Sequence, residues 1–145
     1  MRILLTLFLS SWFALAHAST EIVRQGPFEV QIQPFPSTFL TPEVASTYGF
    51  QRSRQQALLN VVVLRVQADG MARGAVPASV EGFAKNLIGQ TQTLAFKEID
   101  EGEDAIYYLA PVRASNEEVI QIVLTVIPEN GKAIDIDFRH KVYVD

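Results

Sequence analysis

The chain has 145 residues, no cysteine and two histidines, and its formal net charge at pH 7 is −4. The absence of cysteine excludes disulfides and thiolate metal sites, and the acidic balance argues against non-specific nucleic-acid binding and against a polybasic membrane contact. Because 48% of the residues are apolar and no low-complexity tract occurs, the sequence predicts an ordered globular domain.

The first 18 residues have the pattern of a secretory signal peptide. Arg2 gives a positive start, residues 3–15 are mostly apolar, and Ala16-His17-Ala18 has the small residues that precede a cleavage site. The apolar run is shorter than the roughly 20 residues that a membrane-spanning helix needs. We therefore expect export, cleavage after Ala18, no stable membrane anchor and one mature domain over residues 19–145. Loss of Arg2 takes twelve basic residues to eleven against sixteen acidic ones, a net charge near −5.

Alternation of apolar and polar residues predicts β-strands in the first half of the mature chain. Residues 28–33 alternate clearly, and Pro34 and Pro36 are expected to end that strand, because proline cannot donate to a sheet. Residues 58–66 are apolar on both faces, which is typical of a central strand covered on two sides. The tight-turn pair Asp69-Gly70 follows.

A short helix is predicted over residues 41–49, with Thr41 as N-cap, Pro42 at the first helical position and Gly49 at the end. Val44 and Tyr48 are four residues apart and are expected to face the core together. Seven helical residues are too few for stability alone in water, so packing must hold this helix.

Residues 79–88 fit both a helix and a strand. Ser79 could cap a helix that Gly89 ends, and the apolar residues between them follow a helical stripe. Gly82 would then lie inside the helix at a cost of about 1 kcal/mol relative to alanine. Because the neighbouring segments alternate like strands, we predict a strand.

Four further strands are predicted over residues 91–99, 105–112, 118–127 and 132–144. Pro111 indicates an edge or a strand end, and Asn130-Gly131 is a strong hairpin pair. About seven strands with one short helix predict an all-β fold, an antiparallel immunoglobulin-like β-sandwich.

His140 is the one histidine of the mature chain, and it shares the parity of inward-facing neighbours. No Gly-x-Ser-x-Gly elbow accompanies it, so a core-edge histidine with paired ring nitrogens is favoured over a hydrolase. Asp135 and Asp137 are expected about 7 Å apart on one strand face, a spacing compatible with a glycosidase pair. Arg139 and Lys141 continue that row, which favours a neutralised surface instead.

The sequence predicts no metal site, no cofactor and no enzymatic activity. Zinc would need histidine and cysteine ligands that this chain lacks. Residues 100–104 form an acidic turn, but their spacing does not fit the twelve-residue calcium loop, so a solvated turn is favoured.

Five residues are candidates for binding. Arg52 and Arg54 could hold an anionic ligand or a partner's carboxylates, although a solvated loop is favoured. Asn60 interrupts an apolar strand, so we expect it to be buried and bonded to a neighbouring loop. Phe39 and Tyr48 belong to an apolar cluster near the short helix, which core packing explains better than partner docking.

Several segments together resemble a family of small exported gammaproteobacterial proteins, domain of unknown function 4426. The resemblance is carried by Ser37-Thr38-Phe39-Leu40-Thr41-Pro42-Glu43-Val44-Ala45, Tyr48-Gly49, Arg52-Ser53, Leu59-Asn60, Asn86-Leu87-Ile88-Gly89-Gln90, Ala105-Ile106-Tyr107-Tyr108 and Ser115-Asn116-Glu117-Glu118. It implies a periplasmic location and a β-sandwich, and it implies no activity.

The leading hypothesis is a non-catalytic protein-binding or accessory module of the cell envelope, which contacts another envelope protein through the short helix with Arg52 and Arg54. The alternative is a small-ligand carrier with a pocket between the two sheets near that helix and Asn60. A hydrolase based on His140 or on the Asp135 and Asp137 pair is less favoured. The oligomeric state is left open by the sequence.

Overall fold

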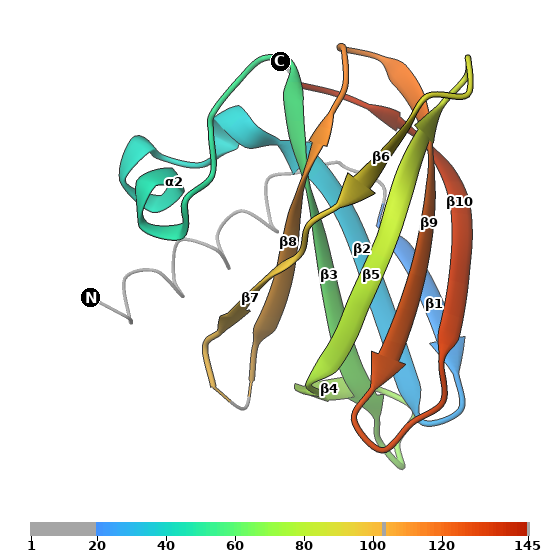
Figure 1. Cartoon of the computed structure of the whole chain (residues 1–145). Coiled ribbons are helices and arrows are strands. Elements are labelled where there is room, and N and C mark those ends of the chain that lie inside the picture. Colours follow the sequence, from blue (N-terminus) through green and yellow to red (C-terminus); the bar gives the residue numbers. More distant parts are fainter. Residues whose placement is uncertain (1–19, 103, 145) are drawn as a thin grey trace.

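The computed structural model describes residues 20–102 and 104–144, which form two antiparallel sheets packed face to face, with one short helix outside them (Figure 1). The predicted signal peptide, residues 1–18, lies outside the described residues. The β-sandwich prediction is confirmed, although the described residues form ten strands rather than about seven. None of the helices in the described ranges has the length and apolar character needed to cross a membrane.

The larger sheet has six strands in the order β1-β2-β3-β8-β7, with β4 paired to β3. The smaller sheet has four strands in the order β10-β9-β5-β6. The bounds are β1 Glu21–Gln25, β2 Phe28–Pro36, η1 Ser37–Phe39, α2 Pro42–Tyr48, β3 Gln56–Val66, β4 Ala72–Ala75, β5 Ala78–Asn86, β6 Thr91–Leu94, β7 Lys97–Asp100, β8 Ile106–Arg113, β9 Glu118–Pro128 and β10 Ile134–Val142.

Strand β2 continues through Pro34 and Pro36, which were expected to end it. The carbonyl of Pro27 accepts a hydrogen bond from Val66 N, so odd-numbered residues of β2 direct their backbone groups toward β3. The two prolines therefore direct their nitrogens to the other side, where β1 pairs only as far as Ile32. Their missing donors cost no hydrogen bond of the sheet.

The single strand expected over residues 91–99 is two strands in different sheets. β6 pairs with β5 in the smaller sheet, whereas β7 pairs with β8 in the larger sheet. Leu94 is buried in the core between the sheets, and Ile99 is buried on the outer face of the larger sheet. Alternation along the segment does not reveal this crossing, because each half alternates correctly by itself.

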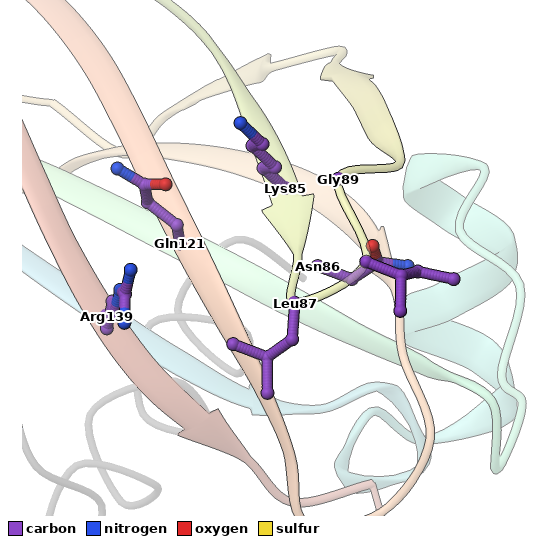
Figure 2. A pocket seen from close by; sticks show the side chains of 7 residues that line it. Lys85, Asn86, Leu87, Gly89, Gln121 and Arg139 are labelled. Atoms are coloured by element: carbon purple, nitrogen blue, oxygen red, sulfur yellow. The ribbon is translucent and has the colours of Figure 1, made fainter.

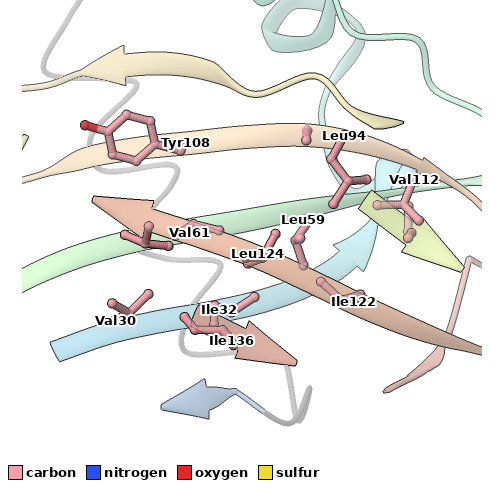
Figure 3. Close-up of a cluster of buried hydrophobic side chains, with 14 of the residues drawn as sticks. Val30, Ile32, Leu59, Val61, Leu94, Tyr108, Val112, Ile122, Leu124 and Ile136 are labelled. Carbon is pink, nitrogen blue, oxygen red and sulfur yellow. The ribbon is translucent and has the colours of Figure 1, made fainter. Parts of the chain in front are cut away.

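The main core fills the space between the two sheets with mostly aliphatic side chains and a few aromatic ones such as Tyr108, as Figure 3 shows. Its fully buried members come from both sheets, and none of them carries a polar group. They include Ile32, Leu59, Val61, Val63, Ile120, Ile122, Leu124, Val126 and Ile134. Full burial of each such side chain stabilises the fold by about 1.5–3 kcal/mol.

Helix α2 packs against the outer face of the larger sheet and has the predicted ends. Thr41 Oγ1 accepts a hydrogen bond from Val44 N at 3.3 Å, and Gly49 closes the helix with a φ of 73°. Val44 packs against the cluster around Leu58, and Tyr48 packs against the cluster around Leu109. Both side chains therefore face the sheet, as their spacing predicts.

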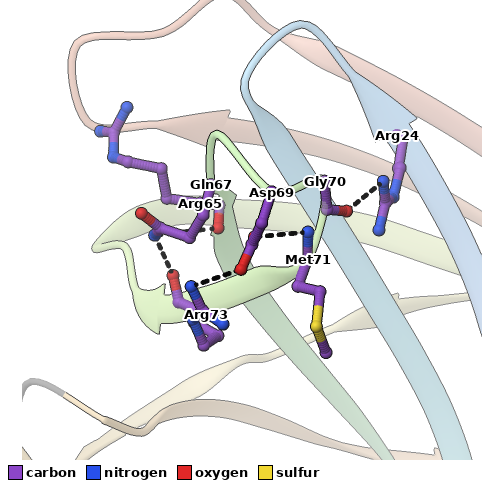
Figure 4. Close-up of polar contacts among 7 residues, drawn as sticks. All are labelled: Arg24, Arg65, Gln67, Asp69, Gly70, Met71 and Arg73. Carbon is purple, nitrogen blue, oxygen red and sulfur yellow. Dashed lines mark hydrogen bonds and ion pairs between the residues drawn. The ribbon is translucent and has the colours of Figure 1, made fainter.

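The predicted Asp69-Gly70 turn joins β3 to β4 and is held by side chains (Figure 4). Asp69 accepts hydrogen bonds from Met71 N and from Arg73 Nη2, at 3.0 and 2.9 Å. Arg24 Nη1 donates to the Gly70 carbonyl at 3.0 Å. Arg24 and Arg73 therefore have a structural role at the β3–β4 turn.

Residues 78–86 form strand β5, so the choice of strand over helix is confirmed. Gly82 lies directly opposite Leu124 of β9, and the two strands approach closely there. A Cβ atom built on Gly82 would lie 2.1 Å from the Val123 carbonyl oxygen and 2.8 Å from Leu124 Cδ2. Gly82, which made a helix unfavourable, is therefore required in the strand because the close approach of β9 leaves no room for a Cβ atom.

The replacement Gly82→Ala is expected to lower the free energy of unfolding by about 1–3 kcal/mol, because backbone atoms must move to admit the methyl group. The measurement is urea unfolding followed by circular dichroism, with the exposed neighbour Glu81→Ala as control. Equal stability of the two variants would contradict the close approach.

Candidate functional site

The α2–β3 loop, residues 49–55, carries Arg52 and Arg54 and is held in place by Ser37. Ser37 is fully buried, and its Oγ donates to the Ser53 carbonyl and accepts from Ser53 N, both at 2.9 Å. One hydroxyl thus satisfies both backbone groups of the residue between the two arginines. The loop is therefore tied to η1 at Ser53 and forms a platform at the surface.

Arg52 and Arg54 are both exposed on this platform. Arg52 Nη2 donates to the Thr38 carbonyl at 3.2 Å, which brings the guanidinium beside η1. The next residue, Phe39, has 47% of its surface exposed. Three of the five predicted binding residues are therefore exposed, and two of them, Arg52 and Phe39, lie at η1.

Tyr48 and Asn60 lie elsewhere. Tyr48 is half-buried, donates to Glu101 Oε1 at 3.5 Å and accepts a hydrogen bond from Lys97 Nζ through its carbonyl. It also packs against the outer face of the larger sheet, so its contacts are those of a residue that attaches α2 to β7 and β8.

Asn60 is 4% exposed and lies on the outer face of β3, between Gln33 of β2 and Leu109 of β8. Its Oδ1 finds no hydrogen-bond partner in the described part of the chain, so the expected bond to a neighbouring loop is not found for this atom. Leu59 and Val61 of β3 belong to the core between the sheets, whereas Leu58 belongs to the outer cluster, so Asn60, which shares the face of Leu58, points away from the space between the sheets. Asn60 therefore does not face the space in which a ligand pocket between the sheets was envisaged.

An open cleft of about 900 Å³ lies at the end of the sandwich, beside the α2–β3 loop. We call it the end cleft. Its walls are the α2–β3 loop on one side and the β5–β6 hairpin on the other, and the end of β8 with the residues after it completes it. The lining is dominated by side-chain amides: Gln51, Gln55, Gln56, Asn86, Gln90 and Gln92, together with Ser53, Thr91, Arg113, Ala114, Ser115 and Glu118.

Some of these amides have structural roles. Gln92 Nε2 donates to the Arg113 carbonyl at 2.9 Å, and Arg113 N donates to Gln92 Oε1 at 2.8 Å. The Gln92 side chain of β6 thus bonds to the N–H and the carbonyl of Arg113 in β8, as the backbone of a neighbouring strand would. This contact connects the two sheets. By contrast, Gln51 and Gln55 have no side-chain hydrogen bond within the described ranges, and their amides are available to a ligand.

Leu87 and Ile88, at the tip of the β5–β6 hairpin, are 72% and 80% exposed, and a second depression of about 370 Å³ lies beside them. Figure 2 shows its lining residues Lys85, Gln121 and Arg139, which come from three neighbouring strands. The sequence patterns gave no indication of this depression, because its residues are far apart along the chain.

Three candidates for hydrolytic chemistry lie on β10. Burial lowers the pKa of His140, and the nearby charge of Glu21 opposes that shift. Asp135 accepts a hydrogen bond from Thr125 Oγ1 at 3.3 Å, and Asp137 accepts one from Gln121 Nε2 at 2.8 Å. The two carboxylates lie on the outer face of the smaller sheet, whereas His140 shares the parity of the buried residues of β10. The histidine and the carboxylates therefore face opposite sides of one strand.

Within the described ranges, no three histidine, aspartate or glutamate side chains come together as potential metal ligands. In the acidic turn, Asp100 Oδ1 accepts a hydrogen bond from Gly102 N at 2.8 Å, which is the ordinary role of aspartate in a turn.

Glu29 is a buried charged residue that alternation had placed on the polar face of its strand. It is 5% exposed, pairs with Arg24 Nε at 2.7 Å and accepts from Gln31 Nε2 at 2.8 Å. Burial by itself would raise the pKa of Glu29, but the hydrogen bonds from Gln31 and Arg24 and the charge of Arg24 outweigh it. The pKa of Glu29 consequently lies below its ordinary value of 4.5.

Because the pKa of Glu29 is lower in the folded chain, its contribution to stability is complete above pH 4.5 and is lost as the pH falls below that value. The variant Glu29→Gln should therefore lose less melting temperature between pH 5 and pH 3 than the parent. Thermal unfolding over this range, with the exposed Glu81→Gln as control, measures the difference. Parallel curves for the parent and Glu29→Gln would refute the assignment.

Replacing Asn60 by valine is expected to raise the free energy of unfolding by about 1 kcal/mol, because an unpaired buried carbonyl costs about 1–3 kcal/mol. Asn60→Asp, which buries a charge at the same position, should destabilise the fold. Denaturant unfolding of both variants is the measurement. A destabilised Asn60→Val would mean that the amide finds a partner in solution.

The model of the family DUF4426, "Domain of unknown function", matches residues 22–145. The crystal structure of a DUF4426 family protein from Pseudomonas aeruginosa, PA0388, is similar with a TM-score of 0.73 and 32% sequence identity. That similarity covers 87% of this chain and 96% of the Pseudomonas chain. No curated protein matches the sequence.

Two structures of FetP from uropathogenic Escherichia coli strain F11 share the fold at low identity. FetP as isolated has a TM-score of 0.57 and 15% identity, and covers 88% of this chain and 95% of its own. A copper-bound FetP variant has a TM-score of 0.58 and 14% identity, and covers 88% of this chain and 92% of its own. Because the family model spans the described domain and a family member shares its fold at 32% identity, the chain belongs to the DUF4426 family.

Proposed function

We propose that this domain is a non-catalytic binding module of the cell envelope, which contacts another envelope protein through the α2–β3 loop and the end cleft. The observation that carries the proposal is the Ser37 clamp, which fixes Ser53 by two hydrogen bonds of 2.9 Å. The clamp holds the backbone that carries the exposed Arg52 and Arg54, and Arg52 lies beside η1, which carries the half-exposed Phe39. Arginine and aromatic side chains contribute disproportionately to protein interfaces, most of all when they are presented without loss of entropy.

The chemistry of the end cleft supports a protein partner. A glutamine amide both donates and accepts, as the backbone of an extended peptide does, so Gln51 and Gln55 could pair with a partner's main chain. Titratable groups are few there: Arg113 and Glu118 are its charged lining residues, and Glu118 accepts a hydrogen bond from Ser115 N at 2.8 Å. Such a lining suits recognition better than acid–base chemistry.

Export to the periplasm is part of the proposal and rests on the pattern of residues 1–18. A protein of the same fold, FetP, was produced in the periplasm of Escherichia coli. The copper of the FetP variant is a property of that protein.

Replacement of Arg52 and Arg54 by alanine together should lower the recovery of a crosslinked partner about tenfold, the effect of losing roughly 1.4 kcal/mol of binding energy. A photocrosslinking residue at position 39 captures the partner in living cells, and the same residue at the exposed Met71, at the opposite end, serves as control. Arg73→Ala with Lys132→Ala removes two charges at that opposite end and should leave recovery unchanged.

Thermal unfolding shows whether each variant remains folded. Equal recovery from the two double variants, or equal crosslinking from positions 39 and 71, would remove the α2–β3 loop from the proposal.

A further inference from the structure

Strand β10 forms one edge of the smaller sheet. It pairs with β9 over nine residues without a register shift, and no described strand pairs with its other side (Figure 1). Edge strands of monomeric proteins are commonly protected by proline, by a bulge or by a charged residue that points inward. Residues 134–142 contain no proline, and the side chains on the core side of β10 are uncharged.

The backbone of β10 presents its unpaired groups at alternate residues. The Val142 carbonyl accepts from Glu117 N at 2.7 Å, on the side of β9, so even-numbered residues direct their groups toward β9. The Ala133 carbonyl, at an odd-numbered position, instead accepts from Gln25 of β1 at 3.3 Å. Residues 135, 137, 139 and 141 therefore direct their N–H and carbonyl groups toward the open edge.

The same four residues form a row of exposed charges on the outer face of the sheet. Asp135 and Asp137 come first, and Arg139 and Lys141 follow them. The row is thus negative in one half and positive in the other, and its midpoint is at the position of Phe138, whose side chain lies on the opposite face. An antiparallel copy of this row is its electrostatic complement.

We propose that two copies of this chain pair antiparallel through β10, with Phe138 of both copies on the two-fold axis. Asp137 then lies opposite Arg139 of the second copy, and Asp135 lies opposite Lys141. Each charge meets its opposite across a directly paired position, where such pairs stabilise a sheet. The two smaller sheets become one continuous sheet, and the interface uses the same surface on both copies.

The proposed register satisfies backbone and charge together. Residues 137 and 139 of the two copies become hydrogen-bonded partners, as do 135 and 141, and all four direct their backbone groups to the seam. A shift of two residues in one direction would place Asp137 opposite Asp137 of the second copy. A shift of two residues in the other direction would place Arg139 opposite Arg139 of the second copy. Like charges at paired positions are destabilising, so these registers are disfavoured.

The core side of the seam adds apolar contact. Phe138 is half-buried and packs against the main core, so pairing about this residue would bring its ring beside that of the second copy. Burial of the exposed parts of two aromatic rings supplements the backbone hydrogen bonds of the new ladder.

The test uses two charge variants that are each self-repelling but complement each other. Asp135→Lys with Asp137→Arg makes the row positive throughout, and Arg139→Asp with Lys141→Asp makes it negative throughout. Sedimentation of the purified protein over a concentration series should show a dimer for the parent and at least a tenfold higher dissociation constant for each variant. An equimolar mixture of the two variants should recover the dimer as a heterodimer.

The matched control is Glu81→Lys with Lys85→Glu, which exchanges two exposed charges on β5 of the same face, away from the seam. It should dimerise like the parent, and circular dichroism confirms folding of all variants. A parent that remains monomeric, a dimer that survives both charge variants, or a mixture that stays monomeric would each overturn the proposal. The proposed contact of the α2–β3 loop with an envelope partner is unaffected by these outcomes.

Discussion

The burial of both faces of β3 is the constraint on which the rest of the structure depends. Leu59, Val61 and Val63 of this strand pack into the space between the sheets, and Leu58 packs against the layer that contains α2. No disulfide supplements this packing, since the chain has no cysteine. One strand therefore couples the main core to the outer layer, and loss of either contact would weaken both.

This coupling extends to the α2–β3 loop at the surface. The chain leaves β2, forms η1 and α2 over the outer face, and returns to the start of β3 through the α2–β3 loop. Leu40 and Ala45 attach the segment of η1 and α2 to the sheet through apolar contacts, and Ser37 attaches the α2–β3 loop through hydrogen bonds. Ser37, Leu40 and Ala45, which belong to the motif that resembles the family, are thus the residues that attach this segment to the sheet.

Much of the fold could be predicted from the sequence, because local patterns determine it. The caps of α2 lie at Thr41 and Gly49 as expected, and β3 and β9 follow their apolar runs. Strand β5 was chosen over a helix because its neighbours alternate like strands. The division of residues 91–99 between two sheets was missed, since period-two alternation carries no information about which partner a strand selects.

The candidate site was less accessible to sequence analysis. Arg52, Arg54 and Phe39 were identified, but the amides of the end cleft come from segments that are distant in the chain and meet only after folding. Burial of Glu29 was also missed, because an ion pair across neighbouring strands leaves no periodic trace.

The crossing of the chain from β6 to β7 has a consequence for how far such domains can associate. On this side the smaller sheet ends in β6, a strand of four residues, whereas β10 on the other side has nine. A very short edge strand offers few backbone groups for pairing, so a sheet with one long edge and one short edge pairs with a single neighbour at the long edge. Stacking of strands into long fibrils requires two open sides, so the architecture permits closed assemblies and resists amyloid-like growth.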